Sequence, residues 1–62
     1  MKKTIDIMNN IIKCKIAGKE QIFTINDFSV ITKEFFELKL FEDDYKYYIN
    51  TKTGERIAVY KE

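Results

Sequence analysis

The stretch that decides the fold spans residues 35–60 and reads FFELKLFEDDYKYYINTKTGERIAVY. It holds three runs rich in aromatic and aliphatic residues, separated by two polar segments, and this pattern predicts a three-stranded antiparallel meander. The first break is EDD at residues 42–44, because three adjacent carboxylates cannot be buried without partners. The second is NTKTGE at residues 50–55, where Gly54 suits the left-handed position that ends a short hairpin turn.

Alternation within each run predicts which side chains share a face, because successive side chains of a strand point to opposite sides. The first strand is expected to place its apolar residues on one face, namely Phe36, Leu38 and Leu40. In the second strand we assign the core face to Tyr45, Tyr47 and Ile49. Tyr48 then lies on the opposite face, where we also expect Tyr60, as an exposed tyrosine pair.

The segment before the meander fits two patterns. Over residues 4–17 isoleucine and methionine recur at helical spacing, but Ile12, Cys14 and Ile16 also alternate with lysines as in a strand. We favour strands, because Gly18 is placed as the turn of a hairpin whose second strand covers residues 21–25. Asn9-Asn10 then forms a turn or bulge. For residues 4–12 alone, helix and strand stay open.

A short helix is predicted over residues 27–34. Asn26 or Asp27 can cap its start, and Phe28, Ile31 and Phe35 recur at helical spacing and are expected to pack across the sheet. The fold class is therefore a small α+β single domain over residues 1–62. It combines an N-terminal β-hairpin, one short helix and the meander, as an open sheet or an SH3-like small barrel.

Composition limits the chemistry of the chain. The 62 residues include one cysteine and no histidine, which excludes an internal disulfide and a Cys/His zinc site and leaves no nucleophile–base pair. We expect a protein that is not an enzyme and that binds neither a cofactor nor a metal. The N-terminal residues hold no long apolar run, so we expect a cytoplasmic protein. Abundant Ile and Lys with two alanines are typical of an AT-rich bacterial, plasmid or phage genome.

Charge is segregated along the chain although the net charge is only +1. Residues 1–19 carry five lysines and one aspartate, for +4. Residues 20–44 carry seven acids and two lysines, for −5, and residues 45–62 return to +2. Opposite charges set apart in this way favour a surface that steers an oppositely charged partner.

Two functions follow as hypotheses. The first is a non-catalytic protein-binding module, from a phage or mobile element, that inhibits a host nucleic-acid-handling or defence complex stoichiometrically. Its predicted partner-binding residues are Glu34, Glu37, Glu42, Asp43, Asp44, Tyr48 and Tyr60.

The alternative is a small nucleic-acid-binding regulator in which sheet tyrosines stack on bases. Its predicted contact residues are Lys13, Lys15, Lys19, Lys46, Lys52 and Arg56. A homodimer that pairs through a strand edge is compatible with either.

Overall fold

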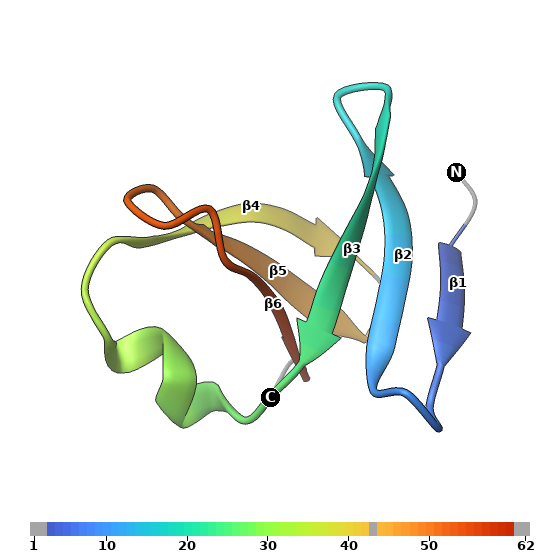
Figure 1. Ribbon diagram of the computed structural model, residues 1–62, viewed down its shortest axis with the longest axis horizontal. Helices are drawn as coiled ribbons and strands as arrows, with labels where there is room; N and C mark the ends of the chain where they lie inside the picture. Colours follow the sequence, from blue (N-terminus) through green and yellow to red (C-terminus); the bar gives the residue numbers. More distant parts are fainter. Residues whose placement is uncertain (1–2, 43, 61–62) are drawn as a thin grey trace.

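The computed structural model describes residues 3–42 and 44–60 as a small compact domain that is mostly β. Six strands are joined by turns, and a single turn of 3₁₀ helix links the two halves of the chain (Figure 1). The elements are β1 (Lys3–Asp6), β2 (Ile11–Ile16), β3 (Lys19–Ile25), η1 (Phe28–Thr32), β4 (Phe36–Glu42), β5 (Tyr45–Asn50) and β6 (Arg56–Tyr60).

The strands form one open, mixed sheet in the order β1-β2-β3-β6-β5-β4. It consists of two antiparallel meanders, β1-β2-β3 and β4-β5-β6, which meet where β3 runs parallel to β6 (Figure 1). The predicted hairpin and meander are therefore confirmed. The order places β1 and β4 at the two edges, which matches the open-sheet alternative.

The N-terminal segment is strand, as favoured. Residues 7–10 form the turn between β1 and β2, and Ile5 pairs with Ile12 across the two strands. Gly18 lies in the β2–β3 turn with φ +79°, and Gly54 ends the β5–β6 turn with φ +80°. Both glycines occupy left-handed backbone, which is why the sequence marks these turns so clearly.

The predicted helix over residues 27–34 is wrong in type and extent. Asp27 caps it as expected, since its carboxylate accepts a hydrogen bond from the Ser29 backbone amide at 3.3 Å. The chain then makes only the 3₁₀ turn η1, and no α-helix occurs in residues 3–42 or 44–60. Three consecutive β-branched residues, VIT at 30–32, disfavour a longer helix. Phe28 and Phe35 remain about half exposed, at 52% and 49%, rather than packed across the sheet.

The core lies on one side of the sheet, here called the inner face. Its buried cluster comprises Ile12, Cys14, Phe23, Tyr45, Tyr47 and Ala58. The assignment of Tyr45 and Tyr47 to the core is thus confirmed. Phe23 of β3 meets Tyr47 of β5 edge to face with ring centroids 5.0 Å apart. This contact joins the two meanders across β6.

The opposite side of the sheet is called the outer face. Ile57 and Val59 belong to it, because they flank inward-facing Ala58 on β6, and both are fully buried. The segment that contains η1 has to pass β6 and β5 to reach β4.

A bulge corrects the predicted face of β4. The register with β5 shifts between Leu38, which pairs with Tyr48, and Leu40, which pairs with Tyr47. Leu40 therefore turns to the inner face and packs against the core, while Phe36 and Leu38 stay on the outer face. Strict alternation could not anticipate this, because a bulge inserts one extra residue into the pattern.

Asn50 organises the turn between β5 and β6. Its side-chain oxygen accepts hydrogen bonds from the amides of Lys52 at 2.8 Å and Thr53 at 3.0 Å. Its side-chain nitrogen donates to the carbonyl of Glu34 at 3.2 Å. One buried side chain thus fixes the turn and also ties it to the segment that enters β4.

We expect Asn50→Ala to lower the free energy of unfolding by about 1–3 kcal/mol, because it removes three part-buried hydrogen bonds between the Asn50 side chain and the backbone. Asn26→Ala is the matched control, since Asn26 makes one side-chain hydrogen bond, to the Thr24 carbonyl at 3.3 Å. Urea unfolding followed by circular dichroism measures both. Equal midpoints for Asn50→Ala and the unchanged protein would contradict this role.

Candidate functional surfaces

The described residues contain no pocket and no cluster of three or more potential metal ligands. None of the helical segments in this part of the chain is long and apolar enough to cross a membrane. The candidate sites in this part of the chain are therefore surfaces.

One surface lies where β4, β5 and β6 meet at the β4–β5 turn. Glu42 pairs with Tyr45 across β4 and β5, and Tyr45 pairs with Tyr60 across β5 and β6. Asp44 is exposed in the turn itself. We call Glu42, Asp44, Tyr45 and Tyr60 the acidic end.

The two tyrosines of the acidic end differ in exposure although their rings are in contact. Tyr45 is 5% exposed and Tyr60 is 64% exposed, with ring centroids 4.7 Å apart. Hydrogen bonding with Tyr60, together with burial, raises the pKa of Tyr45 to about 12. The exposed ring of Tyr60 therefore packs against the buried, neutral phenol of Tyr45.

The predicted tyrosine pair is wrong, because Tyr60 shares the inner face with Tyr45, whereas half-buried Tyr48 lies on the outer face. Two predicted acids also lie away from the acidic end. Glu34 is exposed before β4, and Glu37 lies near the start of β4, where its carboxylate forms an ion pair with Lys39 at 3.0 Å. Asp43 lies outside the described residues. The structure thus brings together Glu42, Asp44 and Tyr60, and separates Glu34, Glu37 and Tyr48 from them.

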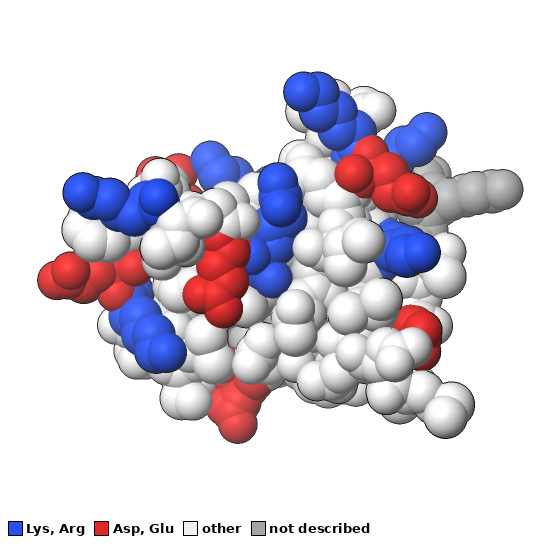
Figure 2. Space-filling view, in the orientation of Figure 1, with Lys and Arg blue, Asp and Glu red and all other residues white. Residues whose placement is uncertain are grey.

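The predicted cationic residues do not form one surface. Lys13 and Lys15 are exposed on the outer face of β2, and Lys19 is exposed at the β2–β3 turn. Arg56 belongs to the inner face, where its Nε donates to the side-chain oxygen of Gln21 at 2.7 Å. In Figure 2 the positive and negative side chains are mixed at the left and upper right, and the lower right, over the β1–β2 turn, is largely uncharged.

Lys46 and Lys52 each lie over an exposed phenylalanine ring. The Lys46 ammonium is 5.5 Å from the centroid of Phe41, and the Lys52 ammonium is 5.1 Å from that of Phe35. Such cation–π contacts are worth about 0.5–1 kcal/mol at exposed sites. Lys46 and Lys52 therefore lie beside the β4 segment and do not form one basic surface with Lys13 and Lys15.

Sequence reasoning missed a second surface, on β4 itself. Leu38 and Phe41 are 48% and 57% exposed, and their pairing with Tyr48 and Lys46 places both on the outer face. We call Phe36, Glu37, Leu38, Lys39 and Phe41 the β4 edge. Strict alternation of side chains along β4 predicts that Phe41 lies on the opposite face of the sheet from Leu38. The bulge brings both side chains to the outer face, and nothing in the sequence marks the position of the bulge.

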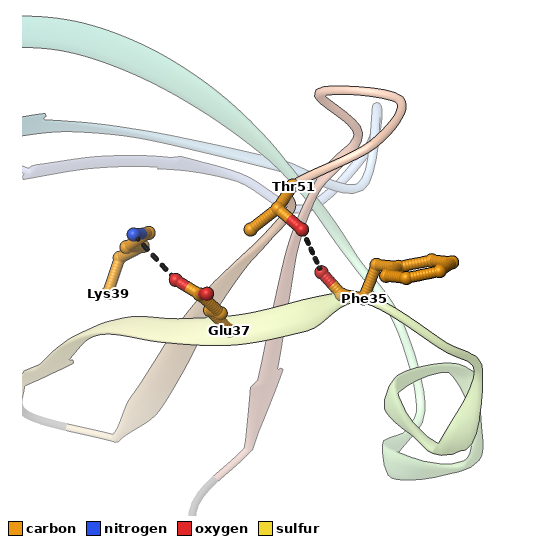
Figure 3. A network of polar contacts seen from close by, with 4 residues as sticks. All are labelled: Phe35, Glu37, Lys39 and Thr51. Atoms are coloured by element: carbon orange, nitrogen blue, oxygen red, sulfur yellow. Dashed lines mark hydrogen bonds and ion pairs between the residues drawn. The ribbon is translucent and has the colours of Figure 1, made fainter.

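Phe35, just before β4, has a backbone conformation that is costly for an aromatic residue. Its φ is +74°, in the left-handed region that glycine or asparagine enters more easily. Its carbonyl accepts hydrogen bonds from the Thr51 amide at 2.8 Å and the Thr51 hydroxyl at 3.3 Å. Figure 3 shows Thr51 hydrogen-bonded to this carbonyl, while the Phe35 ring points away from the sheet. The β5–β6 turn therefore holds the entry to β4 in place.

No protein-family model, curated protein or solved structure matches the chain.

The contact between Tyr45 and Tyr60 predicts a specific alkaline behaviour. A pKa raised to about 12 in the folded protein, against 10.0 for an ordinary tyrosine, means that folding favours the neutral phenol. This stabilisation is fully present below pH 10 and is lost as the pH rises from 10 to about 12. Tyr60→Phe removes the hydrogen bond but keeps the ring, so we expect the pKa of Tyr45 to fall towards 10.

Ultraviolet absorbance of tyrosinate follows this titration, and Tyr48→Phe, on the other face, is the matched control. An unchanged titration of Tyr45 in Tyr60→Phe would rule out the hydrogen bond as the cause.

Proposed function

We propose that this chain is a small non-catalytic protein-binding module that acts stoichiometrically. In its concrete form it is a phage or mobile-element accessory protein that inhibits a host nucleic-acid-handling or defence complex. The observation that carries the proposal is the acidic end. There the exposed Tyr60 ring rests on buried Tyr45 and lies at the same end of the sheet as Glu42 and Asp44.

An exposed aromatic ring with a rigid support is suited to anchor a partner. Tyrosine is enriched among the residues that dominate binding energy, because it supplies a large contact area with few rotatable bonds. Tyr60 is already positioned by its 4.7 Å contact with Tyr45, so less conformational freedom is lost when a partner covers it.

The carboxylates define the partner's chemistry. Asp44 is exposed, and Glu42 is half-buried directly opposite Tyr45. Negative charge beside an aromatic anchor complements a basic surface and raises the rate of encounter with it. Proteins that handle nucleic acids carry such basic surfaces to bind phosphates. A carboxylate-bearing protein can occupy the same surface and exclude the nucleic acid.

Nucleic-acid binding is the second candidate, favoured by the pairs Lys46–Phe41 and Lys52–Phe35. Aromatic rings next to lysines offer stacking platforms and phosphate contacts for a single strand. Glu37 and Glu42 lie on the same strand as Phe41, however, and their charges repel a phosphate backbone. Lys13 and Lys15 lie on another strand. This function therefore ranks second.

The test is a pull-down from bacterial lysate with the tagged protein, with and without nuclease, read by mass spectrometry. We expect a stoichiometric protein partner that survives nuclease treatment. The double variant Glu42→Lys/Asp44→Lys should recover at least tenfold less of it. The matched control is Glu20→Lys/Glu55→Lys, which reverses two exposed acids outside the acidic end and changes the net charge equally.

Circular dichroism verifies that both double variants are folded. Recovery that disappears with nuclease would replace this proposal with the nucleic-acid candidate. Equal recovery by the two double variants would exclude the acidic end as the binding surface.

A further inference from the structure

The crossing between the two meanders contains a segment that is held by its own hydrogen bonds. Residues 27–33, here called the hinge, comprise η1 and the residues that cap it, and in Figure 1 they form the green coil between β3 and β4. Asp27 accepts hydrogen bonds from the amide and hydroxyl of Ser29, and the Thr32 hydroxyl donates to the Ser29 carbonyl. Two backbone hydrogen bonds join Val30 to Asp27 and Lys33 to Val30. In the part of the chain that the structure describes, none of these bonds ties the hinge to a strand.

The chain is anchored on both sides of the hinge. Before the hinge, the Asn26 amide donates to the Ala58 carbonyl at 2.8 Å. After it, the Glu34 carbonyl accepts a hydrogen bond from the Asn50 side chain at 3.2 Å. The contact of Glu34 lies within the β4-β5-β6 meander, so opening of the hinge leaves the entry to β4 in place. Each meander therefore keeps its own contacts when the hinge opens.

The contacts that join the two meanders all connect a residue before the hinge to a residue after it. They are the pairing of β3 with β6, the ring contact of Phe23 with Tyr47 and the hydrogen bond between Arg56 and Gln21. Because every copy of the chain has the same sequence, the first meander of one copy can make these contacts with the second meander of another. The interface of such a pair is the one that the single chain already shows.

The sequence of the hinge suits an extended form as well as a 3₁₀ turn. VIT at residues 30–32 is β-branched throughout, and β-branched residues favour extended backbone. In η1 only Val30 and Ile31 are half-buried and the other residues are exposed, so opening the turn uncovers little apolar surface. The extended hinge reaches about 24 Å. The folded domain measures 29 × 23 × 21 Å, so the opened hinge can link one core to the next.

We propose that two copies of this chain exchange their meanders, so that each core combines β1-β2-β3 of one copy with β4-β5-β6 of the other. The hinge extends and links the two cores, and the contacts across the seam form again between copies. Because the interface is unchanged, the cost of exchange is confined to the opened hinge and to association. Each acidic end stays whole, because all of its residues follow the hinge in one meander. This inference does not depend on the proposed function.

The first experiment unfolds the full chain in urea and refolds it by dilution at micromolar and at millimolar concentration. Analytical ultracentrifugation then measures the products. We expect monomer at the lower concentration and a dimer yield that rises with concentration, because exchange competes with closure of a single chain. Dimer diluted to micromolar concentration should persist, since its separation requires the core to open. Monomer alone at both concentrations, or a dimer that dissociates at once on dilution, would overturn the proposal.

Cross-linking across the seam identifies the exchange itself. Gln21→Cys and Arg56→Cys are mixed, unfolded and refolded together at millimolar concentration, then diluted and treated with a short bis-maleimide. We expect a covalent heterodimer, since the two native side chains approach to 2.7 Å. Buried Cys14 is protected from the reagent in the folded protein. The matched control is Lys13→Cys mixed with Arg56→Cys, because Lys13 lies on the outer face and should not cross-link. A refolded dimer that gives no more heterodimer than this control would contradict exchange.

Shortening the hinge gives an independent arm. A variant without residues 28–32 spans at most about 11 Å from Asn26 to Glu34. The strands β3 and β4 lie three strand spacings apart, about 14 Å, so its single chain cannot close. We expect this variant to be dimeric even at micromolar concentration. The control replaces the same residues by glycine and serine, which keeps the length, and should stay monomeric there. A shortened chain that is folded and monomeric would overturn the proposal, and if it does not fold, the cross-linking decides.

Discussion

The structure depends on the short parallel seam between β3 and β6. Within residues 3–42 and 44–60, two residue pairs join the two meanders there, Thr24 with Ile57 and Ile25 with Ala58. A chain of this size buries only about 60% of the surface that it exposes when unfolded, so neither meander can form a sufficient core alone. The contact of Phe23 with Tyr47 and the hydrogen bond from Arg56 to Gln21 reinforce the seam from the inner face. The core is shared, so we expect the two halves to be stable only together.

Local patterns predicted most of the elements but not their assembly. The hairpin around Gly18, the meander and the inward Tyr45 and Tyr47 follow from period-two alternation and from turn chemistry. The parallel pairing of β3 with β6 links segments far apart in the chain, and no local pattern encodes it. The helix prediction failed because the spacing of Phe28, Ile31 and Phe35 imitates a helical face, whereas the β-branched run at residues 30–32 favours a shorter turn.

The candidate surfaces were predictable only in part, for the same reason. Glu42 and Asp44 were identified by composition, since adjacent acids have to lie in a solvated turn. The place of Tyr60 depends on the register between β5 and β6, and that of Phe41 depends on a bulge. Both are properties of strand pairing. Tertiary pairing thus divides a linear acidic block between two candidate surfaces, the acidic end and the β4 edge.

The two candidate surfaces share strand β4. β4 carries exposed Leu38 and Phe41 and the Glu37–Lys39 ion pair along its length and carries Glu42 at its end. The turn built by Asn50 and Thr51 holds the entry to this strand through the carbonyls of Glu34 and Phe35. We infer that both candidate surfaces also depend on the shared core, because the inner face of the β4-β5-β6 meander packs in one cluster with residues of β2 and β3.

Native-state hydrogen exchange measures that dependence most directly. The account predicts that the amides of β2 and β5, one strand from each meander, exchange with the same free energy of opening, equal to that of global unfolding. A β1-β2-β3 meander that opens at much lower free energy while β5 and β6 stay protected would contradict the shared core.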